Sequence, residues 1–206
     1  MKDFVIRDER NNCDIGLLFP APVYVSQVDN FKDIQNEIRS YIRGVKFEST
    51  PPDWGPTHLI SDPTFSSNIL KDLNIFSTEL RVHVERYCKS LWRRPIPNDY
   101  SADYSCVGSW FALFKKGHYG QIHCHPGCDI SGVYYYKTNG NDGGIFFESP
   151  NLAAHMSNLF SPIRYTPDPL EGKIILFPSW LPHGVMTNDT HNQRISISFN
   201  LKFSEH

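Results

Sequence analysis

The sequence lacks a long apolar run and an excess of charge of either sign. Among its 206 residues, Lys and Arg total 20 and Asp and Glu total 22, which gives a formal net charge of −2. A helix that spans a bilayer needs about 20 consecutive apolar residues, and no stretch of the sequence approaches this length, so we expect no membrane partner. A surface that binds phosphates needs a basic stripe, and the sequence offers only short basic pairs. We therefore expect no nucleic-acid partner.

The sequence also lacks the marks of secretion. Its first residues, MKDFVIRDERNN, are charged and contain no apolar segment of the kind found in signal peptides. The cysteines number five, an odd count, and no Cys-x-x-Cys pair occurs. These features predict reduced thiols and a cytoplasmic location.

Apolar and aromatic residues are abundant instead. They make up 40% and 14% of the chain, which excludes intrinsic disorder. The length fits a single domain, residues 1–206, with a core of its own. The character of the sequence changes near Pro97, from helical periodicity to short strands and turns. We therefore expect residues 1–97 to form an N-terminal strand and helical support.

Two helices are predicted in the first half. A strand-like segment, 17–28, precedes a first helix that begins after Asn30 and ends at Gly44. Residues 45–66 are rich in Pro, Ser and Asp and are expected to form a loop. An apolar stripe at helical spacing predicts a second helix over about 68–92.

The second half predicts strands. The candidates are 105–115, 130–137, 143–148, 172–178 and 194–203. The run Asn-Gly-Asn-Asp-Gly-Gly at 139–144 predicts a hairpin between the second and third of them. Residues 149–171 are long for a connection, and we expect them to pack over a cavity as a lid. Helices followed by strands indicate an α+β fold, with the helices on one side of a sheet or barrel.

The last predicted strand alternates strictly. One face is apolar, with Ile195, Ile197, Phe199 and Leu201, and the other is polar, with Arg194, Ser196, Ser198 and Asn200. A polar face of this kind faces either solvent or a wet cavity inside a barrel.

Three histidines and an arginine suggest a metal centre. His123 and His125 are two residues apart, so in an extended segment they point to the same side. His183 follows in FPSWLPHGV, and Arg194 opens the last strand. Non-haem iron sites of the facial-triad type take three protein ligands and leave positions open for a co-substrate and oxygen. An arginine suits the far carboxylate of such a co-substrate, because it forms bidentate, charge-assisted hydrogen bonds.

These motifs resemble those of the 2-oxoglutarate- and Fe(II)-dependent oxygenases, and above all the group with a His-x-His-Pro segment followed by Ser-Gly-Val-Tyr-Tyr. The matching segments are 123–126, 131–135, 143–145, 177–183 and 194–200. The prolyl 4-hydroxylases share the same plan. The resemblance implies a double-stranded β-helix, a jelly-roll or cupin-like barrel with the metal at its mouth, so that residues 98–206 would be the catalytic core.

The resemblance also implies roles for individual residues. His123 and His183 match the metal-binding histidines of the family. Arg194 matches the residue that pairs with the 5-carboxylate of 2-oxoglutarate, and Ser196 matches a hydroxyl that assists it. Tyr135 matches a tyrosine that donates to the same carboxylate in the prolyl hydroxylases.

His125 departs from the family pattern, because the wider superfamily has Asp or Glu at this position. A neutral imidazole there leaves one more unit of positive charge at the site. We expect His125 to be the third ligand, with Asp129 as the alternative. A zinc site built from the two histidines with Cys124 and Cys128 matches no common spacing.

The function implied is that of an Fe(II)- and 2-oxoglutarate-dependent dioxygenase that consumes O2, with ascorbate as a candidate reductant. It would be a hydroxylase of a peptide or a small molecule. Two alternatives stay open: a three-histidine or cupin-like metalloenzyme that does not use 2-oxoglutarate, and a metal-binding interaction module without catalysis. The sequence specifies no oligomeric state.

Overall fold

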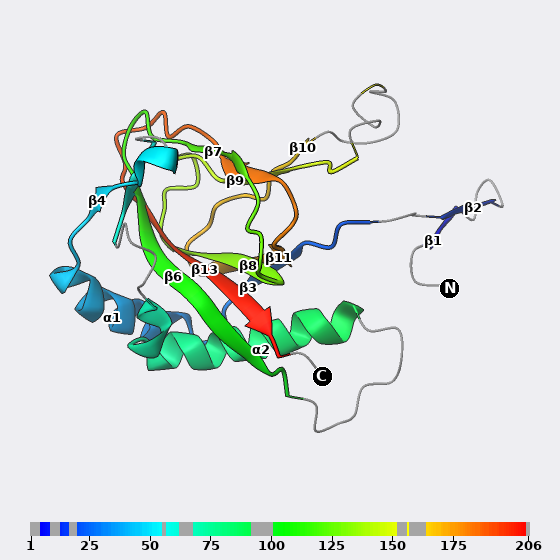
Figure 1. Cartoon of the computed structure of the whole chain (residues 1–206), viewed down its shortest axis with the longest axis horizontal. Helices are drawn as coiled ribbons and strands as arrows, with labels where there is room; N and C mark the ends of the chain where they lie inside the picture. The colour runs from blue at the N-terminus through cyan, green and yellow to red at the C-terminus, as the bar shows by residue number, and fades with distance from the viewer. Residues whose placement is uncertain are drawn as a thin grey trace.

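The computed structural model describes residues 5–8, 13–16, 20–54, 57–61, 68–91, 101–151, 156 and 164–204. Its main features are two antiparallel β-sheets that face each other and two helices that cover the outside of the larger one (Figure 1). None of the described helices is both long and apolar enough to cross a membrane.

The larger sheet has seven strands. In spatial order they are β3 (Tyr24–Gln27), β11 (Lys173–Pro178), β8 (Ile130–Lys137), β13 (Arg194–Phe203), β6 (Tyr104–Phe114), β5 (Leu59–Ile60) and β4 (Glu48–Ser49). β13 is the central strand and pairs with β6 on one side and β8 on the other. The alternation predicted for this strand is confirmed. Its apolar face packs in the core under the helices, and its polar face lines a cavity between the sheets.

The smaller sheet has four strands. They are β10 (Arg164–Tyr165), β9 (Ile145–Glu148), β12 (His183–Val185) and β7 (Gly120–His123). A second apolar cluster, with Val133, Ile175 and Phe147 among its members, fills the space between the two sheets. Two facing antiparallel sheets with supporting helices form the predicted double-stranded β-helix. A separate two-stranded hairpin, β1 (Val5–Asp8) and β2 (Cys13–Gly16), precedes them.

The helices lie against the outer face of the larger sheet, below β6 and β13 in Figure 1. They are α1 (Phe31–Tyr41), which continues as the 3-10 turn η1 (Ile42–Gly44), and α2 (Asn74–Leu91). α1 follows Asn30 as predicted, and its Ile34 and Ile38 are fully buried. Packing of such apolar stripes supplies most of the stability of short helices.

The second helix begins later than its periodicity predicts. Residues Ile69–Lys71 form a 3-10 turn, η3, and the α-helix starts only at Asn74. Its first turn is stabilised by a side chain from α1: the Glu37 carboxylate accepts hydrogen bonds from the backbone N–H groups of Ile75 and Phe76, at 2.8 and 2.9 Å. Four backbone N–H groups at a helix start lack partners within the helix, and a carboxylate satisfies them well.

Two further predictions need correction. The expected loop 45–66 contains the 3-10 turn η2 (Pro52–Trp54) and the short strands β4 and β5, which extend the larger sheet beyond β6. The turn at 139–144 does not close a hairpin, because β8 and β9 belong to different sheets.

The turn at 139–144 passes from one sheet to the other, and a buried carboxylate holds it. Asp142 accepts hydrogen bonds from the Thr138 hydroxyl, the Asn139 backbone N–H and the Asn192 side chain. Gly143 has φ +76°, and a Cβ there would lie 2.3 Å from the Met186 carbonyl oxygen. The glycines therefore serve a sharp crossing between layers, not a two-stranded ribbon.

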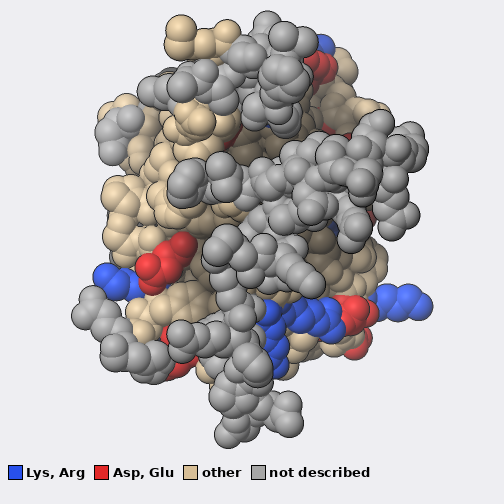
Figure 2. All heavy atoms as spheres, turned by 90° about the vertical axis from the view of Figure 1, so that its right-hand side faces the viewer, with Lys and Arg blue, Asp and Glu red and all other residues tan. Residues whose placement is uncertain are grey.

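Figure 2 shows one side of the molecule, on which the described Lys and Arg side chains lie beside Asp and Glu side chains. On this side the described residues do not gather charge of one sign into a stripe.

Candidate metal centre

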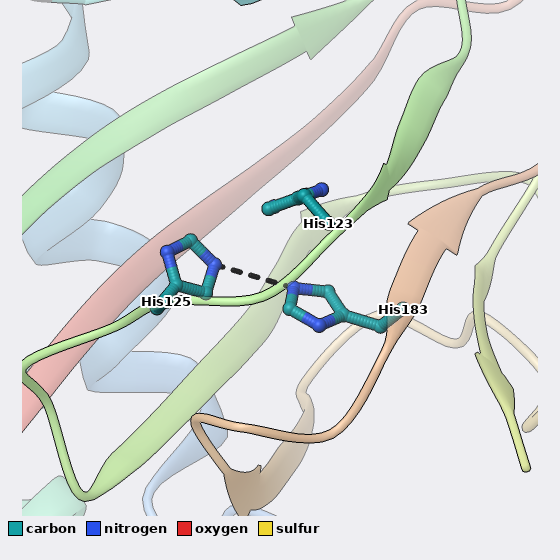
Figure 3. Close-up of side chains that lie close together, drawn as sticks. All are labelled: His123, His125 and His183. Atoms are coloured by element: carbon teal, nitrogen blue, oxygen red, sulfur yellow. Dashed lines mark hydrogen bonds between the residues drawn. The ribbon is translucent and has the colours of Figure 1, made fainter. Parts of the chain in front are cut away.

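Three histidines meet at the mouth of the cavity between the sheets. His123 ends β7, His125 follows it on the next loop, and His183 begins β12 (Figure 3). β12 pairs with β7 so that His183 lies opposite His123. The ligand nitrogens of all three lie within 4.8 Å of one another. The sequence prediction that these three histidines converge is thus confirmed by the geometry.

The distances suit a common metal ion. The Nε2 atoms of His125 and His183 are 3.2 Å apart. Two nitrogens about 2.1 Å from one ion, at right angles to each other, would be about 3.0 Å apart. Imidazole donors suit iron as well as several other transition metals. The residues present therefore fit Fe(II).

Backbone carbonyls set the tautomer of two of the histidines. His123 Nδ1–H donates to the Gln121 carbonyl oxygen at 2.7 Å, and His183 Nδ1–H donates to that of Leu181 at 2.8 Å. Because each Nδ1 carries the proton, each Nε2 keeps a lone pair for a metal. Burial lowers the pKa of His123, that of His125 to about 4 and that of His183 to about 3. All three imidazoles are thus neutral, as ligands must be, near pH 7.

Asp129 and the nearby cysteines lie outside this group. The Asp129 carboxylate accepts a hydrogen bond from the Phe203 backbone N–H at 2.7 Å, and the Cys124 thiol donates to the Trp180 carbonyl. Among the described residues, the one candidate metal cluster contains the three histidines alone. His125 is therefore better placed than Asp129 to be the third ligand.

Arg194 is deeply buried in the same cavity. It is 1% exposed, and its guanidinium lies 4.0 Å above the Phe114 ring. Nη1 donates to the Gly143 carbonyl oxygen, whereas Nε has no hydrogen-bond partner. No carboxylate among the described residues forms an ion pair with this side chain. Burial lowers its pKa, but a guanidinium keeps its charge at all ordinary pH values.

Tyr135 and Ser196 line the same cavity as this arginine. Both are buried. The Tyr135 hydroxyl accepts a hydrogen bond from the Ile145 backbone N–H at 2.9 Å, which leaves its own hydrogen free to donate. Its ring centroid is 5.7 Å from the guanidinium carbon of Arg194. Three side chains from β8 and β13 with hydrogen-bond donors thus line one cavity.

The cavity has a volume of about 350 Å³. Of the described residues that line it, Arg194 is the one formally charged at neutral pH. The side near the histidines is aromatic: Trp54 lies 6.3 Å from the His123 ring and Trp110 lies 6.5 Å from the His125 ring. This end of the cavity suits an uncharged, apolar group.

Sequence reasoning missed part of this wall. His58 has no spacing signal, yet it stacks on Phe114 with ring centroids 4.5 Å apart and lines the cavity. Burial lowers its pKa to about 4, and the charge of Arg194 acts in the same direction. Trp54 also lines the cavity, and its local sequence gives no sign of this. Residues 152–155 and 157–163, most of the expected lid, lie outside the described residues.

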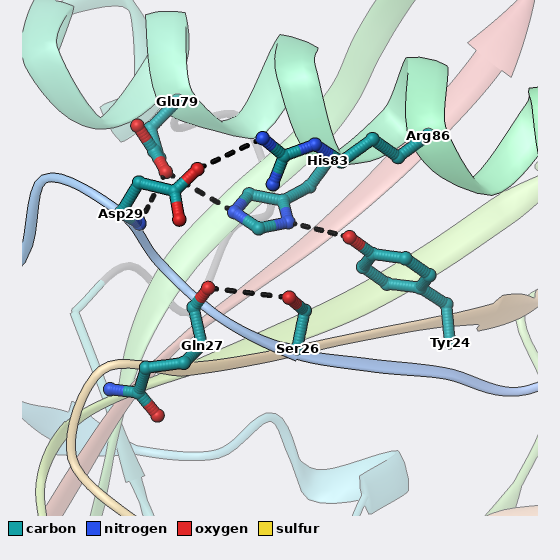
Figure 4. A network of polar contacts seen from close by, with 7 residues as sticks. All are labelled: Tyr24, Ser26, Gln27, Asp29, Glu79, His83 and Arg86. Atoms are coloured by element: carbon teal, nitrogen blue, oxygen red, sulfur yellow. Dashed lines mark hydrogen bonds and ion pairs between the residues drawn. The ribbon is translucent and has the colours of Figure 1, made fainter.

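His83 belongs to a separate polar network on the helical side (Figure 4). This fully buried imidazole contacts the Tyr24 hydroxyl at 2.8 Å and the Glu79 carboxylate at 3.2 Å. Arg86 pairs with Asp29 beside it at 2.9 Å. The network fastens β3 and the segment after it to α2. His83 is therefore a structural histidine whose two ring nitrogens both have hydrogen-bond partners.

Comparisons with known proteins find a matching family model. A protein-family model described as "Putative 2OG-Fe(II) oxygenase" matches residues 108–200. These residues include the three histidines, Tyr135, Arg194 and Ser196. No curated protein sequence matches the chain.

Several solved structures share the fold. The epimerase SnoN from nogalamycin biosynthesis, described as non-heme and alpha ketoglutarate dependent, has 11% identity and a TM-score of 0.64 and covers 89% of this chain and 79% of its own. HygX from Streptomyces hygroscopicus, solved with nickel and 2-oxoglutarate, has 11% identity and a TM-score of 0.58, with 89% and 84% covered.

A prolyl hydroxylase from Trichoplax adhaerens, in complex with a hypoxia inducible factor peptide, has 17% identity and a TM-score of 0.56, with 88% and 83% covered. At these identities, likeness in structure shows the fold alone. The family-model match covers 93 of the 206 residues, less than half of the chain, and shows similarity of this part to the 2OG-Fe(II) oxygenases.

Proposed function

We propose that the protein is an Fe(II)- and 2-oxoglutarate-dependent hydroxylase. His123, His125 and His183 would bind the iron, and Arg194, Ser196 and Tyr135 would bind the far carboxylate of 2-oxoglutarate. Bound iron would supply the chemistry that couples decarboxylation of 2-oxoglutarate, to succinate and CO2, with insertion of an oxygen atom of O2 into a C–H bond.

The observation that carries the proposal is the buried guanidinium of Arg194. Burying a charge without a partner costs several kcal/mol, and proteins rarely keep one without a use. Here the charge lies in a cavity that also contains the three histidines, with one donor nitrogen unpaired. A dicarboxylate that chelates the metal at one end and pairs with Arg194 at the other would fill the open metal positions and neutralise the buried guanidinium.

The residues of this chain do several things in that reaction. Arg194 and Tyr135 hold and orient the co-substrate, and the carbonyls of Gln121 and Leu181 keep two ligand imidazoles in the tautomer that binds metal. Phe114 and the other apolar side chains around them exclude water. A dry cavity strengthens the ion pair and prevents side reactions.

The primary substrate, a peptide or a small molecule, would present an uncharged, apolar C–H group to the metal. Support comes from Trp54 and Trp110, which flank the histidines, and from the absence of a second charged residue among the described lining residues. We keep the cytoplasmic location as a prediction. We expect neither a nucleic-acid partner nor a membrane partner, and we keep the division at residue 97 as a prediction.

The test is an anaerobic Fe(II) titration with and without 2-oxoglutarate, followed by the visible metal-to-ligand charge-transfer band. The band should appear only when both are added and should vanish in His183→Ala. With O2, succinate should then form. Stoichiometric metal binding without the band would overturn the proposal and favour the three-histidine enzyme that does not use 2-oxoglutarate. Binding of both without turnover of any substrate would favour the non-catalytic module.

A further inference from the structure

A chain of buried polar groups leads away from His125. The Asn200 side chain lies with Nδ2 3.3 Å from His125 Nδ1, and its Oδ1 accepts a hydrogen bond from the Ser131 hydroxyl at 2.7 Å. The Ser131 hydroxyl also lies 2.9 Å from that of Ser179. Asn200 is 9% exposed, Ser131 2% and Ser179 0%. These residues come from β13, β8 and the turn after β11, so the row of hydrogen-bonded polar groups crosses three adjacent strands.

His125 differs in this respect from the other two histidines. A carbonyl oxygen can only accept, so it forces a proton onto Nδ1 of His123 and of His183. An asparagine amide has a donor at one end and an acceptor at the other, and it exchanges them when it turns over. The tautomer of His125 therefore depends on which way Asn200 faces.

Both orientations of the amide keep its hydrogen bonds to His125 and to Ser131. With Nδ2 toward His125, Nδ1 accepts and Nε2 carries the proton, which it can donate to His183 Nε2 at 3.2 Å. With Oδ1 toward His125, Nδ1 carries the proton and Nε2 has a free lone pair. Nδ2 then donates to the Ser131 hydroxyl, which donates in turn to Ser179. The first arrangement suits the metal-free site and the second suits a bound metal.

We propose that Asn200 is a positioning residue of the metal centre, whose amide, anchored by Ser131, orients the His125 imidazole and selects its metal-binding tautomer. The inference rests on the proposed function, in that His125 is the third ligand. It also accounts for how a histidine can stand where the family has a carboxylate. A carboxylate needs no tautomer to be chosen, whereas an imidazole does.

The test measures Co(II) binding by calorimetry at neutral pH, in wild type, Asn200→Leu and Asn200→Asp. Asn200→Leu keeps the volume and removes the acceptor, so the Kd for Co(II) should rise about 10–100-fold, as for other groups that orient metal ligands. Asn200→Asp should restore wild-type or tighter binding, because a carboxylate accepts from His125 Nδ1–H. Ser198→Ala, on the same face of β13, is the matched control and should leave the Kd unchanged.

Several results would overturn the inference. They are a wild-type Kd in Asn200→Leu, an equal loss in Asn200→Asp, or an equal loss in Ser198→Ala, which would make the effect one of packing. If Asn200→Leu does not fold, as judged by circular dichroism, Ser131→Ala takes its place. It should weaken Co(II) binding about 2–10-fold, the value of one neutral hydrogen bond, and an unchanged Kd would refute the anchoring role.

Failure of the inference is separable from failure of the proposed function. Wild-type protein that binds no Co(II) contradicts the metal site itself. Wild-type protein that gives the Fe(II)–2-oxoglutarate band while Asn200→Leu binds metal equally well contradicts the role of Asn200 alone.

Discussion

Replacing Arg194 with methionine should separate co-substrate binding from stability. The guanidinium is 1% exposed, so a carboxylate that pairs with it is desolvated as well. Removal of one partner of such a buried pair costs about 3–5 kcal/mol. At 1.36 kcal/mol for each factor of ten, the Kd for 2-oxoglutarate should rise by roughly two to three and a half orders of magnitude.

The free energy of unfolding should change far less. Arg194→Met loses the hydrogen bond to Gly143, worth about 1.5–3 kcal/mol, and the contact with the Phe114 ring, worth about 2 kcal/mol. It also removes the cost of burying a charge without an ionic partner, which is several kcal/mol. These terms oppose each other, so we expect a net change within about 2 kcal/mol.

The assay is calorimetric titration of 2-oxoglutarate into Ni(II)-loaded protein, with urea denaturation of the metal-free protein alongside. Arg86→Met, which removes the same charge from the exposed side of α2, is the control for net charge and should keep the wild-type Kd. A Kd for Arg194→Met within tenfold of wild type would refute the carboxylate-binding role. A loss of stability well beyond 2 kcal/mol with little change in Kd would make this arginine structural.

Three further predictions concern the metal, the pH dependence and the turn between the sheets. His183→Ala should abolish tight Co(II) binding in calorimetry, and a wild-type Kd would contradict the site. The pKa of His58 is about 4 in the folded chain and about 6.5 when unfolded, so the unfolded chain takes up the proton first as the pH falls. Lowering the pH from 7 to 5 should therefore reduce the free energy of unfolding by about 2 kcal/mol. Urea denaturation at pH 7 and at pH 5 measures this fall in the free energy of unfolding, and in His58→Phe the fall should be about 2 kcal/mol smaller than in wild type. An equal fall in both proteins would contradict the role of His58. Gly143→Ala should lower the free energy of unfolding by about 1–3 kcal/mol or more, because the added Cβ would meet the Met186 carbonyl. Gly140→Ala is the control, since Gly140 has a similar φ of +84° but open space around it, and it should cost less. Equal losses in the two variants would show that φ alone matters.

Much of the jelly-roll could be predicted from the sequence, because its strands have strong period-2 patterns. β8 and β13 have the predicted bounds, and β6, β9 and β11 differ by a residue or two. In β13 the pattern placed Arg194 and Ser196 on one polar face, and the structure decides between the two environments left open for that face, solvent and cavity, in favour of the cavity. The three histidines followed from spacing and family resemblance.

Other parts could not be predicted because they depend on contacts distant in the sequence. The Asn-Gly-rich turn has the composition of a hairpin, and the buried Asp142 that redirects it binds Asn192, fifty residues away. β7 and β12 are too short to show a period, and they form because each pairs with a neighbour in the smaller sheet. His58 and Trp54 reach the cavity because β5 adds to the edge of β6, which their local sequence does not indicate.

β13 also fixes the spacing between two residues of the candidate site. Residues two apart on one face of a strand are about 6.6 Å apart, so the Cα atoms of Arg194 and Asn200 are separated by about 20 Å along a strand hydrogen-bonded on both sides. Under the proposed function, Arg194 would bind the far carboxylate and Asn200 would position His125, so one strand fixes the spacing between these two residues. An insertion of one residue between Arg194 and Asn200 would turn one of the two side chains to the opposite face of the strand.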